Sequence, residues 1–395
     1  MEEDIHNYKR RLERTLERVD KLDLYPEDKE LIYRFKDFCT CQNISYGKLD
    51  AYLFYTIKLT NFLKKPIKEA NKDDIMKVVA KLNETNYSEQ TKKCFKVLLK
   101  KLYKYIRGLE GKGEYPEEVK WISTTISRNH QKVPDELINE NEIENIIRSA
   151  QNTRDKALIS ILAESGCRVS EIGLMKIKNV SFEEYGTRIA VSGKTGSRKI
   201  LVINSTPYLQ EWINQHPLNN NSDSFLWYNP LNSKYLSYTR ITSILKTAAK
   251  RAGIKKRIHP HLLRHSRATK MATVMSEASM KQYFGWTQGS NMAGIYVHLS
   301  GKDTDDAILK ANGIEITKKE NIITKMKPLI CNRCKTSNEA TNRFCKICGL
   351  PLTKEIAEET IKEDSEKRKF EDILEIALSD KKVLDMIKEK MKIAQ

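Results

Sequence analysis

The sequence predicts a mainly α-helical protein with one small antiparallel sheet, an α+β class divided into several domains. Apolar residues recur at three- and four-residue spacing along most of the chain, which is the period of an amphipathic helix. One stretch, TRIAVSG followed by SRKILVI at residues 187–203, instead has the composition of two strands joined by a turn. Four closely spaced cysteines near residue 340 predict a separate small module.

The charge of the chain indicates a polyanionic partner. The chain of 395 residues has 70 Lys and Arg and 52 Asp and Glu, which gives a formal net charge of +18 at pH 7. Such an excess favours nucleic acid or an anionic membrane surface, and a merely solvated basic surface is the bland alternative. The sequence has no apolar run long enough to cross a membrane, and its beginning, MEEDIHNYKRRLER, is charged rather than signal-like. We therefore expect a cytoplasmic, nucleoid-associated protein with no membrane role and with reduced thiols.

Residues 1–110 are predicted to form a small basic helical bundle that binds DNA. Helical patterns cover residues 28–39, 49–63, 73–82 and 89–106, with Asp73 and Ser88 as the expected N-caps. Lysines between the apolar positions are candidate phosphate contacts. Residues 111–137 begin with Gly111, Gly113 and Pro116 and are polar, so a linker is expected there.

Residues 138–313 are predicted to form a second domain. Helical patterns occur at residues 140–150, 153–165, 170–177, 206–216, 238–253, 261–274 and 277–286. The second of these should stop at Gly166, and Ser170 is the expected cap of the third. The strand pair lies between them, with a turn at Lys194, Thr195 and Gly196.

The segment 326–352 is predicted to be a zinc ribbon. Its cysteines, Cys331, Cys334, Cys345 and Cys348, follow the pattern C-x2-C-x10-C-x2-C, which matches one tetrahedral, structural Zn²⁺ with no open position. Disulfides are the alternative. Arg and Lys residues interleave with the ligands, so contact with DNA and contact with a protein partner both stay open.

Residues 353–395 are predicted to form a helical tail. Phe370, Leu374, Ala377 and Leu378, then Leu384, Ile387 and Met391, recur at helical spacing. From Leu352 onward, 10 basic and 12 acidic residues leave a net charge of −2, which suits a partner helix better than DNA. A solvated amphipathic tail is an equal alternative.

The stretch HPHLLRHSRAT, residues 259–269, concentrates groups that handle protons and bind anions. In a helix, His261 and Arg264 share one face and His265 lies beside them. Three alternatives give this stretch no catalytic role. They are a helical metal pair of His261 and His265, a core histidine at His265, and surface charges at Arg264 and Arg267. The group suits a phosphodiester, because a guanidinium can donate two hydrogen bonds to its oxygens and an imidazole can move a proton.

Four segments occur in the order found in tyrosine recombinases, the integrase family: GCRVSEIGLMK, the Lys194 turn, HLLRHSRAT and FGWTQGSNMAGIYVHL. The resemblance covers the whole catalytic domain, and residues 1–110 resemble the family's core-binding domain. Within the family, the sequence looks most like archaeal integrases that carry a C-terminal zinc ribbon.

The resemblance implies a set of site residues. The catalytic positions are Arg168, Lys194, His261, Arg264, Trp286 and the nucleophile Tyr296, with Glu171 and His265 in supporting places. Trp286 departs from the histidine usual at that position, a substitution also found in functional members. Arg198 and Lys199 lie close to Lys194 in the same predicted hairpin.

The implied function is site-specific DNA recombination. Arg168 and Arg264 would bind the nonbridging oxygens of a phosphodiester, and Tyr296 would attack phosphorus to leave a 3′-phosphotyrosyl link. Lys194 would protonate the departing 5′-oxygen, and His261 would act as base or acid. The resemblance implies that neither a metal, ATP nor any other cofactor takes part in the chemistry.

The implied partners are double-stranded DNA and three further copies of the chain, because recombination needs four active sites around two duplexes. SGKDTDDAILKANGI, residues 300–314, resembles the segment that docks onto a neighbouring protomer. The alternatives are a non-catalytic DNA-binding regulator on the same scaffold, a relaxing topoisomerase, and a resolvase of host chromosome dimers rather than an integrase of a mobile element.

Overall fold

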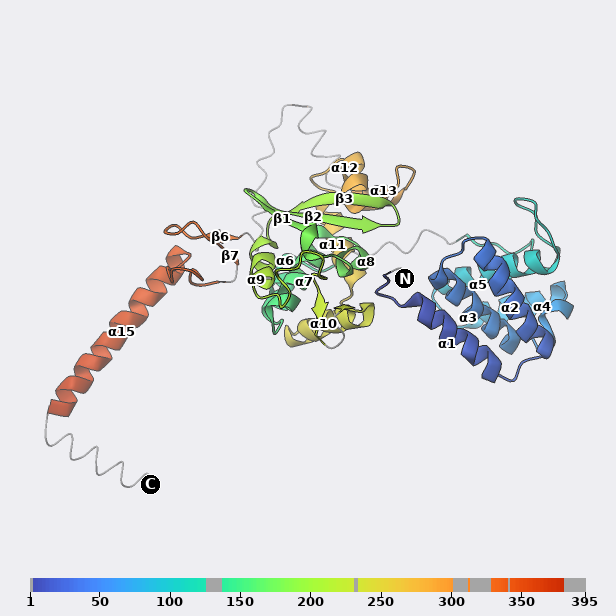
Figure 1. The fold of residues 1–395 in the computed structure, drawn as a ribbon, viewed down its shortest axis with the longest axis horizontal. Coiled ribbons are helices and arrows are strands. Elements are labelled where there is room, and N and C mark those ends of the chain that lie inside the picture. Colours follow the sequence, from blue (N-terminus) through green and yellow to red (C-terminus); the bar gives the residue numbers. More distant parts are fainter. Residues whose placement is uncertain are drawn as a thin grey trace, which may run out of the picture. The chain divides into compact units, whose positions relative to one another are not determined.

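The computed structural model describes residues 3–125, 137–230, 234–300, 312, 328–339 and 342–379, with the backbone alone for 297–300 and 374–378 (Figure 1). The chain divides into two compact units, Met1–Pro134 and Asp135–Gln395. Residues 301–311 and 313–314 of the expected docking segment lie outside the described residues, as do Leu384, Ile387 and Met391 of the tail and residues 126–136 of the expected linker.

The first unit is a helical bundle. Its elements are α1 (Tyr8–Lys21), α2 (Pro26–Cys41), α3 (Tyr46–Phe62), the short 3₁₀ turn η1 (Ile67–Glu69), α4 (Lys72–Glu84) and α5 (Glu89–Ile106). Helix α3 is central, because it packs against α1, α2, α4 and α5. Leu53 and Leu59 of α3 are completely buried in one apolar core with Phe35 and Leu98.

Of the two N-caps expected in the bundle, the one of α5 is confirmed and the one of α4 is not. The Ser88 side chain accepts a hydrogen bond from the Thr91 amide, as the expected cap of α5 should. The cap of α4 is Asn71 rather than Asp73, because Asn71 and Asp74 form a reciprocal capping box and Asp73 lies inside the first turn. The expectation for Asp73 was therefore wrong.

The bundle core extends past residue 110. Val119 and Ile122 are buried in it, and the Lys100 ammonium donates to the Ile122 carbonyl. An ion pair between Arg107 and Glu118 also ties this segment to α5. Two buried apolar residues, a hydrogen bond and an ion pair thus anchor the first part of the segment that the sequence assigned to a linker.

The second unit holds the predicted small sheet among helices. Its helical elements are α6 (Glu140–Arg148), α7 (Thr153–Ser165), α8 (Val169–Gly173), the 3₁₀ turn η3 (Ile177–Asn179), α9 (Thr206–Asn214), α10 (Tyr238–Arg251), α11 (Pro260–Met271), α12 (Glu277–Phe284) and α13 (Met292–Ser300). Helix α7 is buried along most of its length and packs against α6, α9, α11 and β3. It ends at Gly166, whose φ of 57° is left-handed, as expected.

Helix α8 is shorter than the sequence predicted and begins earlier. The cap position is Arg168 rather than Ser170, because the backbone amide of Arg168 donates to the Glu171 carboxylate. Ser170 lies within the helix, so that expectation was wrong. The early start brings Arg168 to the N-terminal edge of α8, next to the end of α7.

The sheet has the order β1-β2-β3, with β1 (Val180–Glu183), β2 (Gly186–Gly193) and β3 (Gly196–Val202) all antiparallel. The pair Gly193↔Gly196 closes the expected hairpin with Lys194 and Thr195 as its two-residue turn. Strand β1 was not expected. A second antiparallel pair, β4 (Tyr228–Asn229) with β5 (Lys234–Tyr235), is two residues long in each strand.

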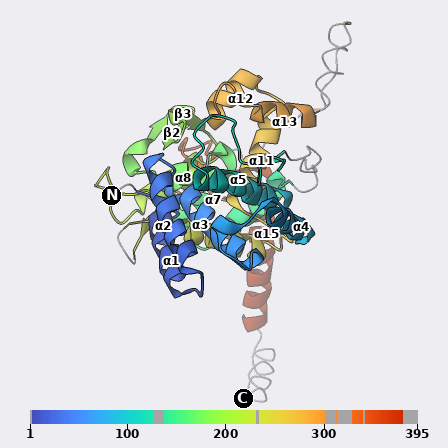
Figure 2. The same ribbon diagram turned by 90° about the vertical axis from the view of Figure 1, so that its right-hand side faces the viewer.

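Helices α12 and α13 pack together and lie next to the β2–β3 hairpin (Figures 1 and 2). Further along the chain, β6 (Leu329–Ile330) and β7 (Ser337–Asn338) form an antiparallel pair, and α15 (Lys354–Ser379) is a 26-residue helix. The mainly helical class with small antiparallel sheets is confirmed. In the part of the chain that the structure describes, no helix has the length and apolar character needed to cross a membrane.

Candidate active site

Arg264 lies at the centre of the site. It comes from α11, is only 7% exposed, and donates to the carbonyls of Gly166 and Phe284 at 2.8 Å each. Its guanidinium lies 5.3 Å from the ring centre of Phe284 and 5.5 Å from that of Trp286. Burial, together with the neighbouring charge of Arg168, lowers the pKa of Arg264 to about 10, so the group still carries its charge at neutral pH.

Arg168 comes from the start of α8 and is one-third exposed. It donates to the Glu171 carboxylate at 3.0 Å and to the Gly285 carbonyl at 3.3 Å. A partly exposed guanidinium with its orientation fixed by a buried carboxylate is prepared to bind an anion.

Glu171 is held by a second arginine that the sequence did not assign to the site. Arg198 of β3 donates to both carboxylate oxygens, at 3.0 and 2.9 Å, and to the Cys167 sulfur at 3.5 Å. Burial by itself would raise the pKa of Glu171, but the hydrogen bonds and charges of Arg198 and Arg168 outweigh it and hold the pKa below its usual value. Glu171 therefore stays ionised and orients both arginines.

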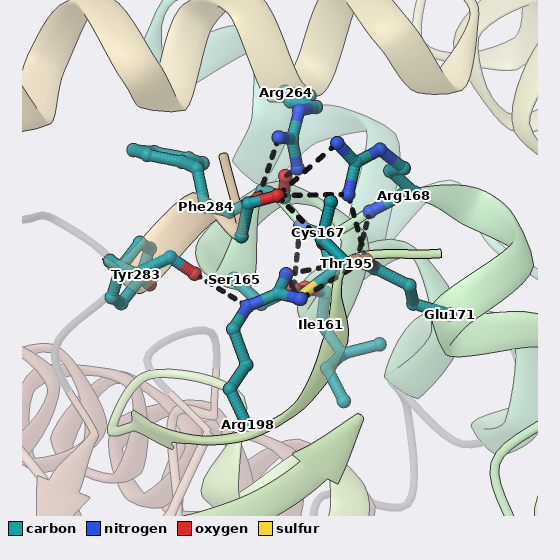
Figure 3. A network of polar contacts seen from close by, with 12 residues as sticks. Ile161, Ser165, Cys167, Arg168, Glu171, Thr195, Arg198, Arg264, Tyr283 and Phe284 are labelled. Atoms are coloured by element: carbon teal, nitrogen blue, oxygen red, sulfur yellow. Dashed lines mark hydrogen bonds and ion pairs between the residues drawn. The ribbon is translucent and has the colours of Figure 1, made fainter. Parts of the chain in front are cut away.

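Three arginines meet at the C-terminal end of α12. Arg198 donates to the Tyr283 carbonyl, Arg264 to that of Phe284 and Arg168 to that of Gly285. Figure 3 shows the three guanidinium groups gathered around this point. The last carbonyls of a helix lack partners within the helix and form the negative end of its dipole, so cations are stabilised there. The end of α12 thus gathers positive charge from α8, β3 and α11.

The β2–β3 hairpin reaches the same point. The Thr195 hydroxyl donates to the Gly285 carbonyl at 2.9 Å, so that carbonyl accepts from both Thr195 and Arg168. Lys194 precedes Thr195 in the turn and is exposed. The structure therefore brings the Lys194 turn beside Arg168.

His261 lies one turn before Arg264 on α11, with its residue exposed at the surface. Desolvation of the ring and the positive charges of Arg264 and Arg168 lower the pKa of His261. The imidazole is therefore neutral at pH 7, which leaves one nitrogen able to accept a proton and the other able to donate one.

Tyr296 of α13 is 4% exposed and lies in an aromatic stack. Its ring is nearly parallel to Trp286, with centroids 5.6 Å apart and planes 3° apart, and Trp286 stacks in turn on Phe284 at 4.9 Å. Burial raises the pKa of Tyr296, and Arg264 opposes this rise. The hydroxyl forms a hydrogen bond with Nδ1 of half-buried His265.

The structure brings Arg168, Arg264, Trp286 and Tyr296 into one cluster, with His261 on its exposed side and the Lys194 turn at its edge. Sequence reasoning did not assign Arg198, Thr195 or Gly285 to this cluster. The single available signal was their closeness in sequence to Lys194 and Trp286.

Two of the non-catalytic alternatives for this stretch are not supported. Arg267, expected as a surface charge, is half-buried, and its positive charge partly offsets the rise that burial causes in the pKa of Tyr283. The alternative of a metal pair at His261 and His265 gains no support, because in the described residues the four cysteines are the only group of three or more His, Cys, Asp or Glu side chains placed to hold a metal.

The four cysteine sulfurs of the ribbon all lie within 4.8 Å of one another. Four thiolates around one ion at about 2.3 Å would be about 3.8 Å apart, so the spacing fits a tetrahedral metal site. Contacts of 3.4 Å between Cys334 and Cys345 and of 3.5 Å between Cys331 and Cys348 are far too long for disulfide bonds.

Backbone hydrogen bonds form the two halves of the cluster in the same way. The amide of Cys331 donates to the carbonyl of Thr336, and that of Cys345 donates to the carbonyl of Leu350. Buried Asn338 joins the halves, because its amide nitrogen donates to the Thr336 carbonyl and its oxygen accepts from the Lys346 amide. Backbone amides of Cys348 and Ile347 lower the pKa of Cys345 to about 6, which favours the thiolate that a metal needs.

Known proteins resemble this chain in sequence and in fold. Residues 136–302 match the model of the phage integrase family. Tyrosine recombinase XerA of Pyrococcus horikoshii is 27% identical over 284 residues, which cover 71% of this chain and 94% of that protein. The XerA of Pyrococcus furiosus is 26% identical over 287 residues, with the same coverage.

Two solved structures share the fold. The XerH site-specific recombinase bound to its difH substrate has a TM-score of 0.54 at 18% identity, over 78% of this chain and 97% of that one. A λ integrase tetramer bound to a Holliday junction has a TM-score of 0.54 at 15% identity, over 68% of this chain and 76% of that one. Residues 136–302 therefore form a domain of the phage integrase family, and the relatives named above are tyrosine recombinases.

Proposed function

We propose that this protein is a site-specific recombinase that cuts and rejoins double-stranded DNA through a covalent link to Tyr296. The main support is that two guanidinium groups and a tyrosine lie in one cluster. Arg264 and the ring of Tyr296 contact Trp286, and Arg168 donates to the carbonyl of the preceding residue, Gly285. Both DNA-bound relatives named above have this fold, which supports DNA as the substrate.

Each side chain has a defined chemical task in this proposal. Arg168 and Arg264 hold the nonbridging oxygens and stabilise the charge that develops on them. The Tyr296 oxygen attacks phosphorus, so that a P–O bond to tyrosine forms while the P–O5′ bond breaks. Lys194 gives its proton to the departing 5′-oxygen, and His261 serves as base or acid.

The proposal also covers the bound metal, the assembly of the protein, a partner surface and its place in the cell. The four cysteines hold one structural Zn²⁺, which would order the ribbon and take no part in strand transfer. Four copies assemble on two duplexes, as in the λ integrase tetramer on its junction. Ile330 and Ile347 of the ribbon and Phe370 of α15 are more than 60% exposed, which suits a protein partner. DNA as substrate assigns the protein to the cytoplasm, with the nucleoid.

The test begins with a library of randomised duplexes that carry a nick, so that a cleaved end diffuses away and the covalent intermediate accumulates. DNA that stays attached to the protein after denaturation is sequenced and gives the site. We expect adducts with the wild-type protein and none with Tyr296→Phe. Binding of the library without any adduct would favour a non-catalytic regulator and contradict the proposal.

Strand exchange between two selected duplexes separates the remaining alternatives. A recombinase yields products that combine both duplexes, whereas a relaxing topoisomerase reseals each duplex on its own. Selected sites that match a chromosomal dimer-resolution site would favour a resolvase, and sites at the borders of a mobile element would favour an integrase.

A further inference from the structure

The turn of the β2–β3 hairpin lies between two glycines. Gly193 and Gly196 flank its two-residue turn, and Gly196 has a left-handed φ of 102° with open space around its Cα. Glycine leaves the backbone more freedom than any other residue. Lys194 is exposed in this turn, so the position of its ammonium depends on what holds the tip.

A single side chain in the turn reaches the centre of the site. The Thr195 hydroxyl donates to the Gly285 carbonyl, 90 residues away along the chain. That carbonyl also accepts from Arg168. The bond therefore fixes the hairpin tip against the group that would hold the phosphodiester.

Gly285 is itself fixed in place. It caps α12 with a left-handed φ of 62°, and a Cβ there would lie 2.5 Å from the Arg198 guanidinium. Arg198 belongs to β3 and binds both Glu171 and the Tyr283 carbonyl, so it anchors the base of the same hairpin to α12. Arg198 holds the stem of the hairpin and Thr195 holds its tip.

We propose that the Thr195 hydroxyl tethers the hairpin to the C-terminal end of α12 and thereby positions Lys194 to protonate the departing 5′-oxygen. The inference rests on the proposed function, because it assumes that Lys194 donates this proton. Thr195 is a positioning residue. The proton moves from the Lys194 ammonium to O5′ as the P–O5′ bond breaks and the bond from phosphorus to the Tyr296 oxygen forms, and the phenol proton of Tyr296 passes to a base, the role proposed for His261.

The variant Thr195→Val keeps the shape of the side chain and removes the donor, whereas Thr195→Ser keeps the donor. Loss of one hydrogen bond of ordinary strength predicts cleavage that is about three- to tenfold slower for Thr195→Val. Thr195→Ser should stay within about twofold of wild type on the same scale. Ser197→Ala is the matched control, because the Ser197 hydroxyl pairs with Ser192 across the hairpin and not with Gly285; it should cleave at the wild-type rate.

A second substrate tests the route through Lys194. The selected nicked duplex is made with sulfur in place of the bridging 5′-oxygen at the mapped cleavage position. A thiolate leaves without needing a proton, because thiols are far stronger acids than alcohols. Single-turnover adduct formation by Thr195→Val and by Lys194→Ala should then approach the wild-type rate.

The outcomes separate the inference from the function beneath it. If Lys194→Ala is rescued by sulfur and Thr195→Val is equally slow on both substrates, Thr195 does not act through leaving-group protonation and the inference is overturned. An unchanged rate for Thr195→Val on the oxygen substrate overturns it too. If Lys194→Ala itself is not rescued, the assignment of Lys194 as proton donor fails.

Discussion

At the scale of single residues, the hydroxyl of the proposed nucleophile has one specific partner. Tyr296 is nearly buried, and its hydroxyl is paired with His265. The pairing holds the phenol oxygen in a defined direction within the stack on Trp286. His265 was a candidate for a satisfied core histidine, and its hydrogen bond joins it directly to Tyr296, the proposed nucleophile.

Replacement of His265 should therefore affect cleavage according to whether an acceptor remains. His265→Asn can present an oxygen near the position of Nδ1, whereas His265→Leu leaves the buried hydroxyl unpaired, at a cost of about 1–3 kcal/mol. We expect His265→Leu to form adduct at least about tenfold more slowly than His265→Asn on the selected duplex. Equal single-turnover rates for the two variants would show that the bond has no role.

Sequence alone was sufficient to select candidate residues for the site but not to predict the hydrogen bonds between them. The chemistry of HPHLLRHSRAT and the order of the segments were sufficient to select Arg168, Arg264 and Tyr296, whose grouping the structure now shows. The contacts of Arg198 and Thr195 join residues 27 and 90 positions apart. Such pairings depend on how the hairpin packs against α8 and the end of α12, and local periodicity carries no information about that packing.

At the scale of elements, the C-terminal end of α12 combines a left-handed glycine, Gly285, with contacts from three arginine side chains. Gly285 has a φ of 62° and a Cβ would meet Arg198, whereas Gly253, at the end of α10, has a φ of 71° with nothing within 4 Å of a Cβ. The two glycines thus share a left-handed backbone conformation and differ in their surroundings.

The substitution Gly285→Ala should destabilise the protein more than Gly253→Ala. Strain alone costs about 1 kcal/mol in each variant. Gly285→Ala must in addition displace the Arg198 guanidinium from Glu171, so its urea midpoint should fall further and its cleavage rate should fall as well. Equal midpoints for the two variants would show that Arg198 does not depend on the glycine.

The ribbon is the second element with a direct test. We expect one zinc ion per chain in the purified protein, measured by elemental mass spectrometry, and loss of that ion in Cys345→Ser. Four further reactive thiols, those of the ribbon cysteines, should appear once a chelator removes the metal. A metal-free protein without those thiols would indicate disulfides and contradict the assignment.

Elements were predictable where a periodic pattern and a strong end signal coincide. Helix α7 between Asn152 and Gly166 and the hairpin around Lys194 are such cases. The start of α8 was not, because its cap is a hydrogen bond from the Arg168 backbone to Glu171 rather than to a serine hydroxyl. Strand β1 was also missed, since its four residues have no pattern until β2 pairs with them.

At the scale of the whole molecule, the charge of +18 is the dominant property. If the basic surface contacts several phosphates, binding of the selected duplex should weaken steeply with salt. Six to ten contacts predict a loss of about 10³–10⁵ in affinity between about 50 and 200 mM salt. Fluorescence anisotropy of a labelled duplex measures this, and a nearly flat dependence would argue against binding through the basic surface.

The central claim is that the Tyr296 oxygen becomes bonded to DNA phosphorus while Arg168 and Arg264 hold the phosphate. Its most direct test is to digest the covalent adduct with protease and nuclease and to identify the modified peptide by mass spectrometry. We predict a nucleotide 3′-phosphate on the phenol of Tyr296 in the peptide that contains GIYVHL. A nucleotide on any other residue, or an unmodified Tyr296 in an authentic adduct, would contradict the account.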